Sequence, residues 1–211
     1  GLVAAGAAAA QPSVARRCAA AGRGGLEFMV GIPGSVGGAV RMNAGGHGSD
    51  TAAWLVSARV IDLRRVVVRE RPAAALGLAY RHSDLADTDL VVAATFRTLA
   101  RPRREGAAIM REIIRWRCQN QPGGTVNAGS VFKNPPGDAA GRLIDQAGLK
   151  GLRVGGVTVS DKHANFFVAD DSASAQDLYY LVAVVRERVR ERTGITLEPE
   201  VRFVGPFDEA P

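Results

Sequence analysis

The first hundred residues carry two kinds of hydrophobic spacing. Residues 12–22 place Val14 and Cys18 four positions apart, on one face of a predicted helix. The alanine-rich residues before them predict a strand that leads into this helix. Further short runs rich in β-branched residues predict strands at residues 56–63, 66–70 and 90–99. Strands and helices are therefore mixed from the start of the chain.

The helical spacing returns in the middle of the chain. Ile109, Ile113 and Trp116 recur at intervals of four and three, which predicts an amphipathic helix. A second helix is expected after Gly137 and Asp138, with apolar residues facing inward and a glycine near its end. The residues in question are Leu143, Ile144, Ala147 and Gly148.

The last third of the chain predicts two strands and a long helix. The strands, residues 154–160 and 165–170, flank His163. The helix begins near Ser174, because Asp177 three residues later can complete a capping pair, and Gly194 ends it.

A boundary between two lobes is expected at the basic segment 100–105, where charge and turn residues interrupt the apolar pattern. A last strand is predicted at residues 196–204. The sequence therefore predicts an α+β protein with domains at residues 1–102 and 103–211 and without internal repeats.

Composition narrows the class of protein. Of 211 residues, 46% are hydrophobic and 23% charged, and no apolar run is long enough to span a bilayer, so we expect no membrane partner. Cys18 and Cys118 stand alone, without the spacing of a metal site or redox pair, which suits a reducing cytoplasm. The net charge of +6 invites a nucleic-acid partner, but the arginines are scattered and not interleaved with aromatic residues, so we expect none.

Residues 31–48, GIPGSVGGAVRMNAGGHG, form a glycine-rich segment that matches neither a dinucleotide fingerprint nor a Walker loop. Glycine clusters mark either strained turns and close chain crossings or a backbone that approaches a ligand. Free backbone N–H groups could hold phosphates here. Both interpretations stay open on the loop alone.

Three further stretches could carry chemistry. In NAGSVFKNP (residues 127–135), Ser130 follows a glycine, but no histidine has an obvious triad partner, so a proton-donating serine fits better than a nucleophile. In LEPEVRF (residues 197–203), a strand would place Glu198 and Glu200 on one face. In AYRHS (residues 79–83), Arg81 could bind a carboxylate or phosphate through its planar fork.

Six ordered motifs, GIPGSVGGAVRMNAGG, YRHS, NAGSVFKNP, AGLKG, HANF and EPEVRFVG, together resemble the bacterial UDP-N-acetylenolpyruvoylglucosamine reductase (MurB) family of peptidoglycan synthesis. The chain has no long insertion near the glycine loop, and in this it resembles the shorter, type II form of the family. The resemblance covers essentially the whole chain. It implies that residues 1–102 are the later part of a vanillyl-alcohol-oxidase (PCMH) type FAD-binding domain and that residues 103–211 are the substrate-binding domain.

The resemblance implies an NADPH-dependent, FAD-mediated reduction of UDP-N-acetylglucosamine enolpyruvate to UDP-N-acetylmuramate by a cytoplasmic monomer. Arg81 and Glu200 match residues that polarise the substrate carboxylate, and Ser130 matches the serine that protonates the second carbon. The positions carried over as flavin contacts are Gly34, Ser35, Gly37, Gly38, Asn43 and Arg202. The positions carried over as substrate contacts are Tyr80, Lys133, Asn134 and His163.

Two features depart from the family pattern. His47 stands where the family usually has an aromatic residue. An earlier flavin lobe, with a glycine-serine-asparagine motif that binds the pyrophosphate, has no counterpart before residue 31. The alternative to a reductase is therefore a non-catalytic fragment of the same fold that does not hold FAD.

Overall fold

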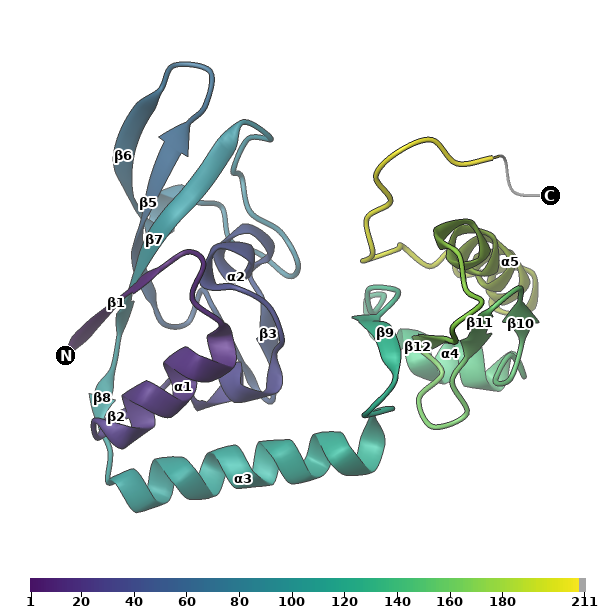
Figure 1. Ribbon diagram of the computed structural model, residues 1–211, viewed down its shortest axis with the longest axis horizontal. Helices are drawn as coiled ribbons and strands as arrows, with labels where there is room; N and C mark the ends of the chain where they lie inside the picture. Colours follow the sequence, from purple (N-terminus) through teal and green to yellow (C-terminus); the bar gives the residue numbers. More distant parts are fainter. Residues whose placement is uncertain (209–211) are drawn as a thin grey trace. The chain divides into compact units, whose positions relative to one another are not determined.

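The computed structural model describes residues 1–208 and divides into two compact units, Gly1–Arg117 and Cys118–Pro211 (Figure 1). The division lies later than the boundary expected after residue 102. Helix α3 (Arg103–Asn120) starts directly after that boundary, but its buried Met110 and Ile113 pack into the core of the first unit. Tertiary packing, which the charged segment before the helix does not reveal, therefore sets the division.

A four-stranded antiparallel sheet forms one layer of the first unit, with strand order β1-β7-β5-β6 (Figure 1). Its strands are β1 (Leu2–Gly6), β5 (Leu55–Asp62), β6 (Val67–Pro72) and β7 (Asp89–Arg97), which confirms the four predicted strands of this region. Strand β5 buries Leu55, Ala58 and Val60 and exposes Val56 and Arg59. The alternation gives the sheet one face toward the core.

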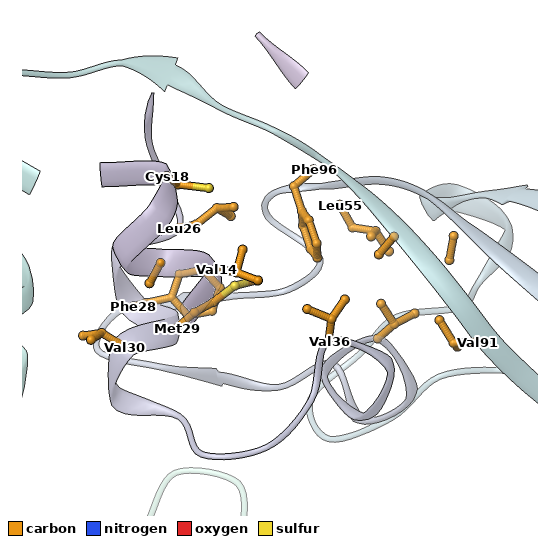
Figure 2. Close-up of a cluster of buried hydrophobic side chains, with 14 of the residues drawn as sticks. Val14, Cys18, Leu26, Phe28, Met29, Val30, Val36, Leu55, Val91 and Phe96 are labelled. Carbon is orange, nitrogen blue, oxygen red and sulfur yellow. The ribbon is translucent and has the colours of Figure 1, made fainter. Parts of the chain in front are cut away.

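Helices α1 (Gln11–Ala20) and α2 (Val36–Met42) and the 3-10 helix η1 (Glu27–Gly31) contribute their buried residues to the core of this unit. Figure 2 shows Val14 and Cys18 of α1 in the same cluster as Leu55 and Phe96 of the sheet, as the spacing in α1 predicts. Short elements complete the unit: β2 (Arg23–Gly24), β3 (Gly45–Gly46), β4 (Ser49–Asp50), η2 (Ala73–Ala75) and β8 (Leu99–Ala100).

The second unit has its own antiparallel sheet, in the order β10-β11-β12-β9, and two helices. The elements are β9 (Val126–Ser130), α4 (Ala140–Gln146), β10 (Arg153–Val154), β11 (Val157–Val159), β12 (Phe166–Ala169) and α5 (Ala175–Thr193). The capping box of Ser174 and Asp177 is present, and Gly194 ends α5 in the left-handed conformation, as predicted. No helix within residues 1–208 has the length and apolar character needed to cross a membrane.

The strand predicted at residues 196–204 is wrong. Within the described residues this segment forms only an isolated bridge, between Phe132 and Pro199. The N–H of Lys133 donates to Glu198 O at 2.9 Å, and the N–H of Glu200 donates to Val131 O at 2.8 Å. Pro199 lies between these two bonds and has no N–H to donate, so the pairing does not extend into a strand.

Candidate active site

The glycine loop uses its backbone amides within the chain. The N–H groups of Val36 and Gly37 donate to Ala9 O and Ala7 O at 2.9 and 2.8 Å, and the N–H of Gly38 donates to Ser35 Oγ at 3.2 Å. Ser35 is the N-cap of α2, so these amides stabilise the start of a helix. These three N–H groups are therefore used within the chain and are not free to hold phosphates.

Two positions of this loop require glycine, each for a different physical reason. A Cβ on Gly37 would lie 3.0 Å from the Cβ of Ala7, so Gly37 permits a close crossing of two segments. Gly34 has φ of +117°, which favours glycine, and the nearest atom to a Cβ placed there is Gln11 Nε2 at 3.9 Å. The close crossing is one of the two interpretations that the sequence left open, and open space remains beside Gly34.

Gln11 was missed by the sequence analysis. The residue is only 2% exposed, and its backbone N–H donates to Gly34 O at 2.9 Å. The side-chain Oε1 is buried without a hydrogen-bond partner among the described residues. An unpartnered buried acceptor is costly unless a bound group donates to it. A polar residue three and four positions before the buried Val14 and Ala15 is the signal that could have found it. The Gln11 atom that lies beside Gly34 is Nε2, so this place suits a cofactor group that accepts a hydrogen bond.

His47, the departure from the family pattern, acts as a packing ring. Its ring meets that of Trp116 edge-on at 5.3 Å, and a Cβ on Gly31 would lie 2.6 Å from His47 Nε2. Burial, followed by the nearby charge of Arg117, lowers the pKa of His47. The neutral imidazole therefore fills the place of an aromatic side chain.

Arg81 lies in a tight turn of the first unit. Ala79 and His82 exchange two backbone hydrogen bonds, at 3.1 and 3.2 Å, which puts Tyr80 and Arg81 at the tip. The guanidinium of Arg81 lies 5.1 Å from the centre of the Tyr80 ring and donates to Gly45 O at 3.3 Å. The predicted substrate contacts Tyr80 and Arg81 are therefore adjacent, and the Tyr80 side chain is exposed.

A cavity of about 440 Å³ in the second unit brings Ser130, Asn134 and His163 together. Ser130 is the last residue of β9, Asn134 lies in the loop that follows, and His163 precedes β12. The Ser130 hydroxyl makes no hydrogen bond within the described part of the chain, so its proton is available. Burial lowers the pKa of His163, and its neutral ring accepts the Asn165 N–H at Nδ1, 3.2 Å away.

The same cavity is lined by three cations that the sequence did not single out, Arg142, Lys150 and Lys162. Lys150 pairs with Asp145 at 2.6 Å, and Arg142 pairs with Asp138, whose pKa its hydrogen bond lowers to about 2. Lys162 instead donates to a neutral acceptor, the carbonyl of Cys118, at 2.6 Å. The charge of Lys162 is therefore not offset by that partner, and the cavity favours an anion.

The remaining predicted residues of this unit lie outside the cavity lining. Lys133 Nζ pairs with Glu198 Oε1 at 2.6 Å. Glu200 is partly exposed, and its N–H donates to the carbonyl of Val131, the residue after Ser130. Arg202 is exposed. The backbone bond to Val131 therefore ties Glu200 to the segment that carries Ser130.

Asn165 fixes the segment that carries Ser130. Its side chain, 3% exposed, accepts the Phe132 N–H at 2.9 Å and donates to Phe132 O at 2.8 Å. Its own backbone O accepts the Val131 N–H at 2.9 Å. One buried amide thus satisfies both backbone groups of a residue two positions after Ser130.

Asn165→Ala is expected to lower the free energy of unfolding by about 3 kcal/mol, because it leaves the buried N–H and C=O of Phe132 without partners. Urea unfolding measures the change. The control is Gln146→Ala on the exposed face of α4, which should cost less than about 0.5 kcal/mol. A loss below about 1 kcal/mol for Asn165→Ala would show that the two hydrogen bonds between Asn165 and the Phe132 backbone are not a main source of stability.

Fold and site together define an α+β protein that carries a glycine-rich loop in one unit and a serine beside a cationic cavity in the other. Residues 121–204 match the family of the UDP-N-acetylenolpyruvoylglucosamine reductase C-terminal domain. The UDP-N-acetylenolpyruvoylglucosamine reductase of Trichlorobacter lovleyi is 43% identical over 205 residues, which cover 96% of this chain and 67% of that protein. That of Rubrobacter xylanophilus is 48% identical over 196 residues, which cover 92% and 65%.

The crystal structure of UDP-N-acetylenolpyruvylglucosamine reductase (MurB) from Thermus caldophilus is similar with a TM-score of 0.83 and 39% identity, over 96% of this chain and 71% of that one. The chain belongs to the UDP-N-acetylenolpyruvoylglucosamine reductase family. The α+β class and the family resemblance are thereby confirmed. The chain spans about two thirds of the length of the curated relatives it matches.

Proposed function

We propose that this chain supplies the glycine loop and the substrate cavity of a cytoplasmic flavin-dependent reductase. The reaction is the reduction of UDP-N-acetylglucosamine enolpyruvate to UDP-N-acetylmuramate, with NADPH as hydride donor. The observation that carries the proposal is the cavity in which Ser130, Asn134 and His163 meet a net positive charge. It agrees with the activity after which relatives more than 40% identical to this chain are named.

The charge of the cavity suits a nucleotide sugar. Diphosphate oxygens accept charge-assisted hydrogen bonds from ammonium and guanidinium groups. Arg142 lies in α4, and Lys150 and Lys162 lie in two different loops, yet all three line the same space. In this proposal they bind the anionic part of the substrate, while the amide of Asn134 orients it beside Ser130.

Gly34, Ser35 and Gln11 are the residues that would hold FAD in the first unit. The Ser35 oxygen accepts the Gly38 N–H, which leaves its hydroxyl hydrogen for a phosphate or ribityl oxygen. Gln11 Nε2, the atom nearest to a Cβ placed on Gly34, would donate to a cofactor oxygen. When bound, FAD supplies the hydride chemistry between NADPH and the substrate.

The chemistry of the protein's own residues concerns charge and one proton. As an enolpyruvyl ether gains hydride at its distal carbon, negative charge grows on the adjacent carbon and its carboxylate. Arg81 and Glu200 stabilise that carboxylate, and the Ser130 hydroxyl donates the proton to the adjacent carbon. Arg81 and Glu200 thus share one role, and Ser130 has a separate one.

The test uses the polypeptide that the complete reading frame encodes, purified with FAD. NADPH oxidation should depend on the enolpyruvyl substrate, and UDP-N-acetylglucosamine, which lacks the C=C bond, is the matched control. A protein that binds FAD but oxidises NADPH equally with either sugar would overturn the proposed activity. A protein that binds neither FAD nor substrate would favour the non-catalytic alternative.

The 211-residue chain by itself is expected to bind FAD weakly, because it spans only about two thirds of its relatives. Flavin absorbance after gel filtration, with circular dichroism as evidence of folding, measures retention. Stoichiometric FAD on the folded 211-residue chain would contradict this expectation.

A further inference from the structure

Two residues of the first unit hold unusual backbone conformations and are bonded to each other's segments. Asn43, the C-cap of α2, has φ of 42°, and Arg81 has φ of 53°. Both values lie in the left-handed region, which is costly for residues other than glycine and persists only where the surroundings hold it. Asn43 Nδ2 donates to the carbonyl of Ala79, in the turn that carries Arg81, at 2.9 Å.

The Asn43 side chain is buried, and both of its amide hydrogens are used within the chain. Besides Ala79 O, its Nδ2 donates to Asp50 Oδ2 at 3.2 Å, and its Oδ1 accepts the Ala52 N–H at 2.8 Å. Its side chain is 3% exposed. An amide with two hydrogens has then no donor left for a flavin. The geometry argues for a role inside the protein in place of the flavin contact carried over from the family.

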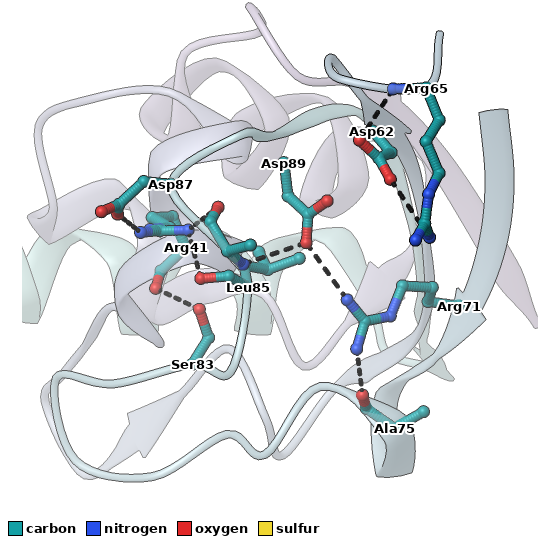
Figure 3. Close-up of polar contacts among 10 residues, drawn as sticks. Arg41, Asp62, Arg65, Arg71, Ala75, Ser83, Leu85, Asp87 and Asp89 are labelled. Atoms are coloured by element: carbon teal, nitrogen blue, oxygen red, sulfur yellow. Dashed lines mark hydrogen bonds and ion pairs between the residues drawn. The ribbon is translucent and has the colours of Figure 1, made fainter. Parts of the chain in front are cut away.

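A second set of bonds attaches the same turn to α2. Ser83 Oγ donates to Arg41 O at 2.6 Å, and Arg41 Nη1 donates to Leu85 O and Ala86 O at 2.6 and 2.7 Å. Figure 3 shows the hydrogen bonds that join Arg41 to Ser83 and to Leu85. The guanidinium of Arg81 also donates to Gly45 O, just beyond Asn43. Residues 79–86 are therefore attached to the C-terminal end of α2, whose N-terminal end is preceded by Gly34 and capped by Ser35.

We propose that Asn43 is a positioning residue for Arg81. It fixes the turn at the C-terminal end of α2, so that this short helix sets the distance from Gly34 and Ser35, at its other end, to the guanidinium of Arg81. The inference rests on the proposed function, in which the loop borders FAD and Arg81 binds the substrate carboxylate. Loss of the Asn43 amide then weakens substrate handling without touching the hydride transfer from NADPH.

The test variant is Asn43→Gly, because glycine accepts the positive φ while removing all three side-chain hydrogen bonds. Hydrogen exchange of the peptide that spans residues 79–83 should become at least about tenfold faster. Asp62→Gly is the matched control. Asp62 Oδ1 accepts the N–H groups of Arg64 and Arg65 in another turn with a positive φ, at Val66, so its loss should leave exchange at 79–83 unchanged (Figure 3).

The functional arm uses the complete enzyme. Asn43→Gly should raise KM for the enolpyruvyl substrate about tenfold, leave flavin reduction by NADPH unchanged, and be non-additive with Arg81→Lys. Unchanged exchange at 79–83, or full additivity with Arg81→Lys, would overturn the proposal. Faster exchange in a parent protein without reductase activity would overturn the proposed function while supporting the attachment of the turn to Asn43.

Discussion

Ser130→Ala is expected to slow the reduction of the enolpyruvyl substrate by about a hundred- to ten-thousand-fold, the usual range for loss of a general acid. Reduction of FAD by NADPH should keep its rate, because that half-reaction protonates no substrate carbon. The hydroxyl lines the cavity and makes no hydrogen bond within the described residues, so its removal leaves no buried partner unsatisfied. Rapid mixing follows the flavin absorbance in the two half-reactions separately.

Two further variants sharpen this test. Ser130→Cys keeps a side chain of similar size that carries an ionisable hydrogen, and it should keep part of the rate that Ser130→Ala loses. Ser172→Ala removes an exposed hydroxyl of the same unit, which donates to Asp170, and should alter neither half-reaction. Equal slowing of both half-reactions in Ser130→Ala would make Ser130 a folding or positioning residue.

Local signals in the sequence predicted the elements whose ends are set by their own residues. Helix α5 is the clearest case, because Ser174, Asp177 and Gly194 cap it through bonds within a few positions. The strand prediction for residues 196–204 was wrong because the pairing of this segment depends on Val131 and Lys133, more than sixty positions away, and on the missing N–H of Pro199. Long-range pairing of this kind leaves no mark in a hydrophobic pattern.

Some residues of the candidate site could be predicted from the sequence, and others could be found only in the folded structure. Motif comparison found Ser130, Asn134 and His163, which the fold brings to one cavity. It did not single out Arg142, Lys150 and Lys162, although Lys150 stands in the AGLKG motif. Basic residues are common on surfaces, and only the folded chain shows that these three face the same space.

In the glycine loop, too, the sequence predicts the kind of contact but not the residues that make it. Glycine content indicated a close approach, yet nothing in the sequence names Ala7 as the residue that Gly37 approaches. The buried acceptor of Gln11 emerges only when its partners are counted. Sequence therefore predicts which residue types carry chemistry, and packing decides which of their polar atoms stay available.

Glu200→Ala is expected to lower turnover by about a hundredfold, near the lower end for removal of one group that stabilises developing charge. Substrate binding should stay nearly intact. Glu200→Gln should keep part of the rate, since an amide still donates a hydrogen bond to a carboxylate but shares no proton. The backbone of Glu200 is held by Val131 O, so either change leaves that hydrogen bond in place.

Glu198 provides a control two residues away in the same segment. Its side chain is 70% exposed and pairs with the partly buried Lys133, and ion pairs at the protein surface contribute about 0–1 kcal/mol. Glu198→Ala should therefore change turnover and melting temperature little. Steady-state rates and melting curves of the three variants separate a catalytic carboxyl from a surface one. Unaltered turnover in Glu200→Ala, at an unaltered melting temperature, would remove Glu200 from the site and leave Arg81 as the group that faces the substrate carboxylate.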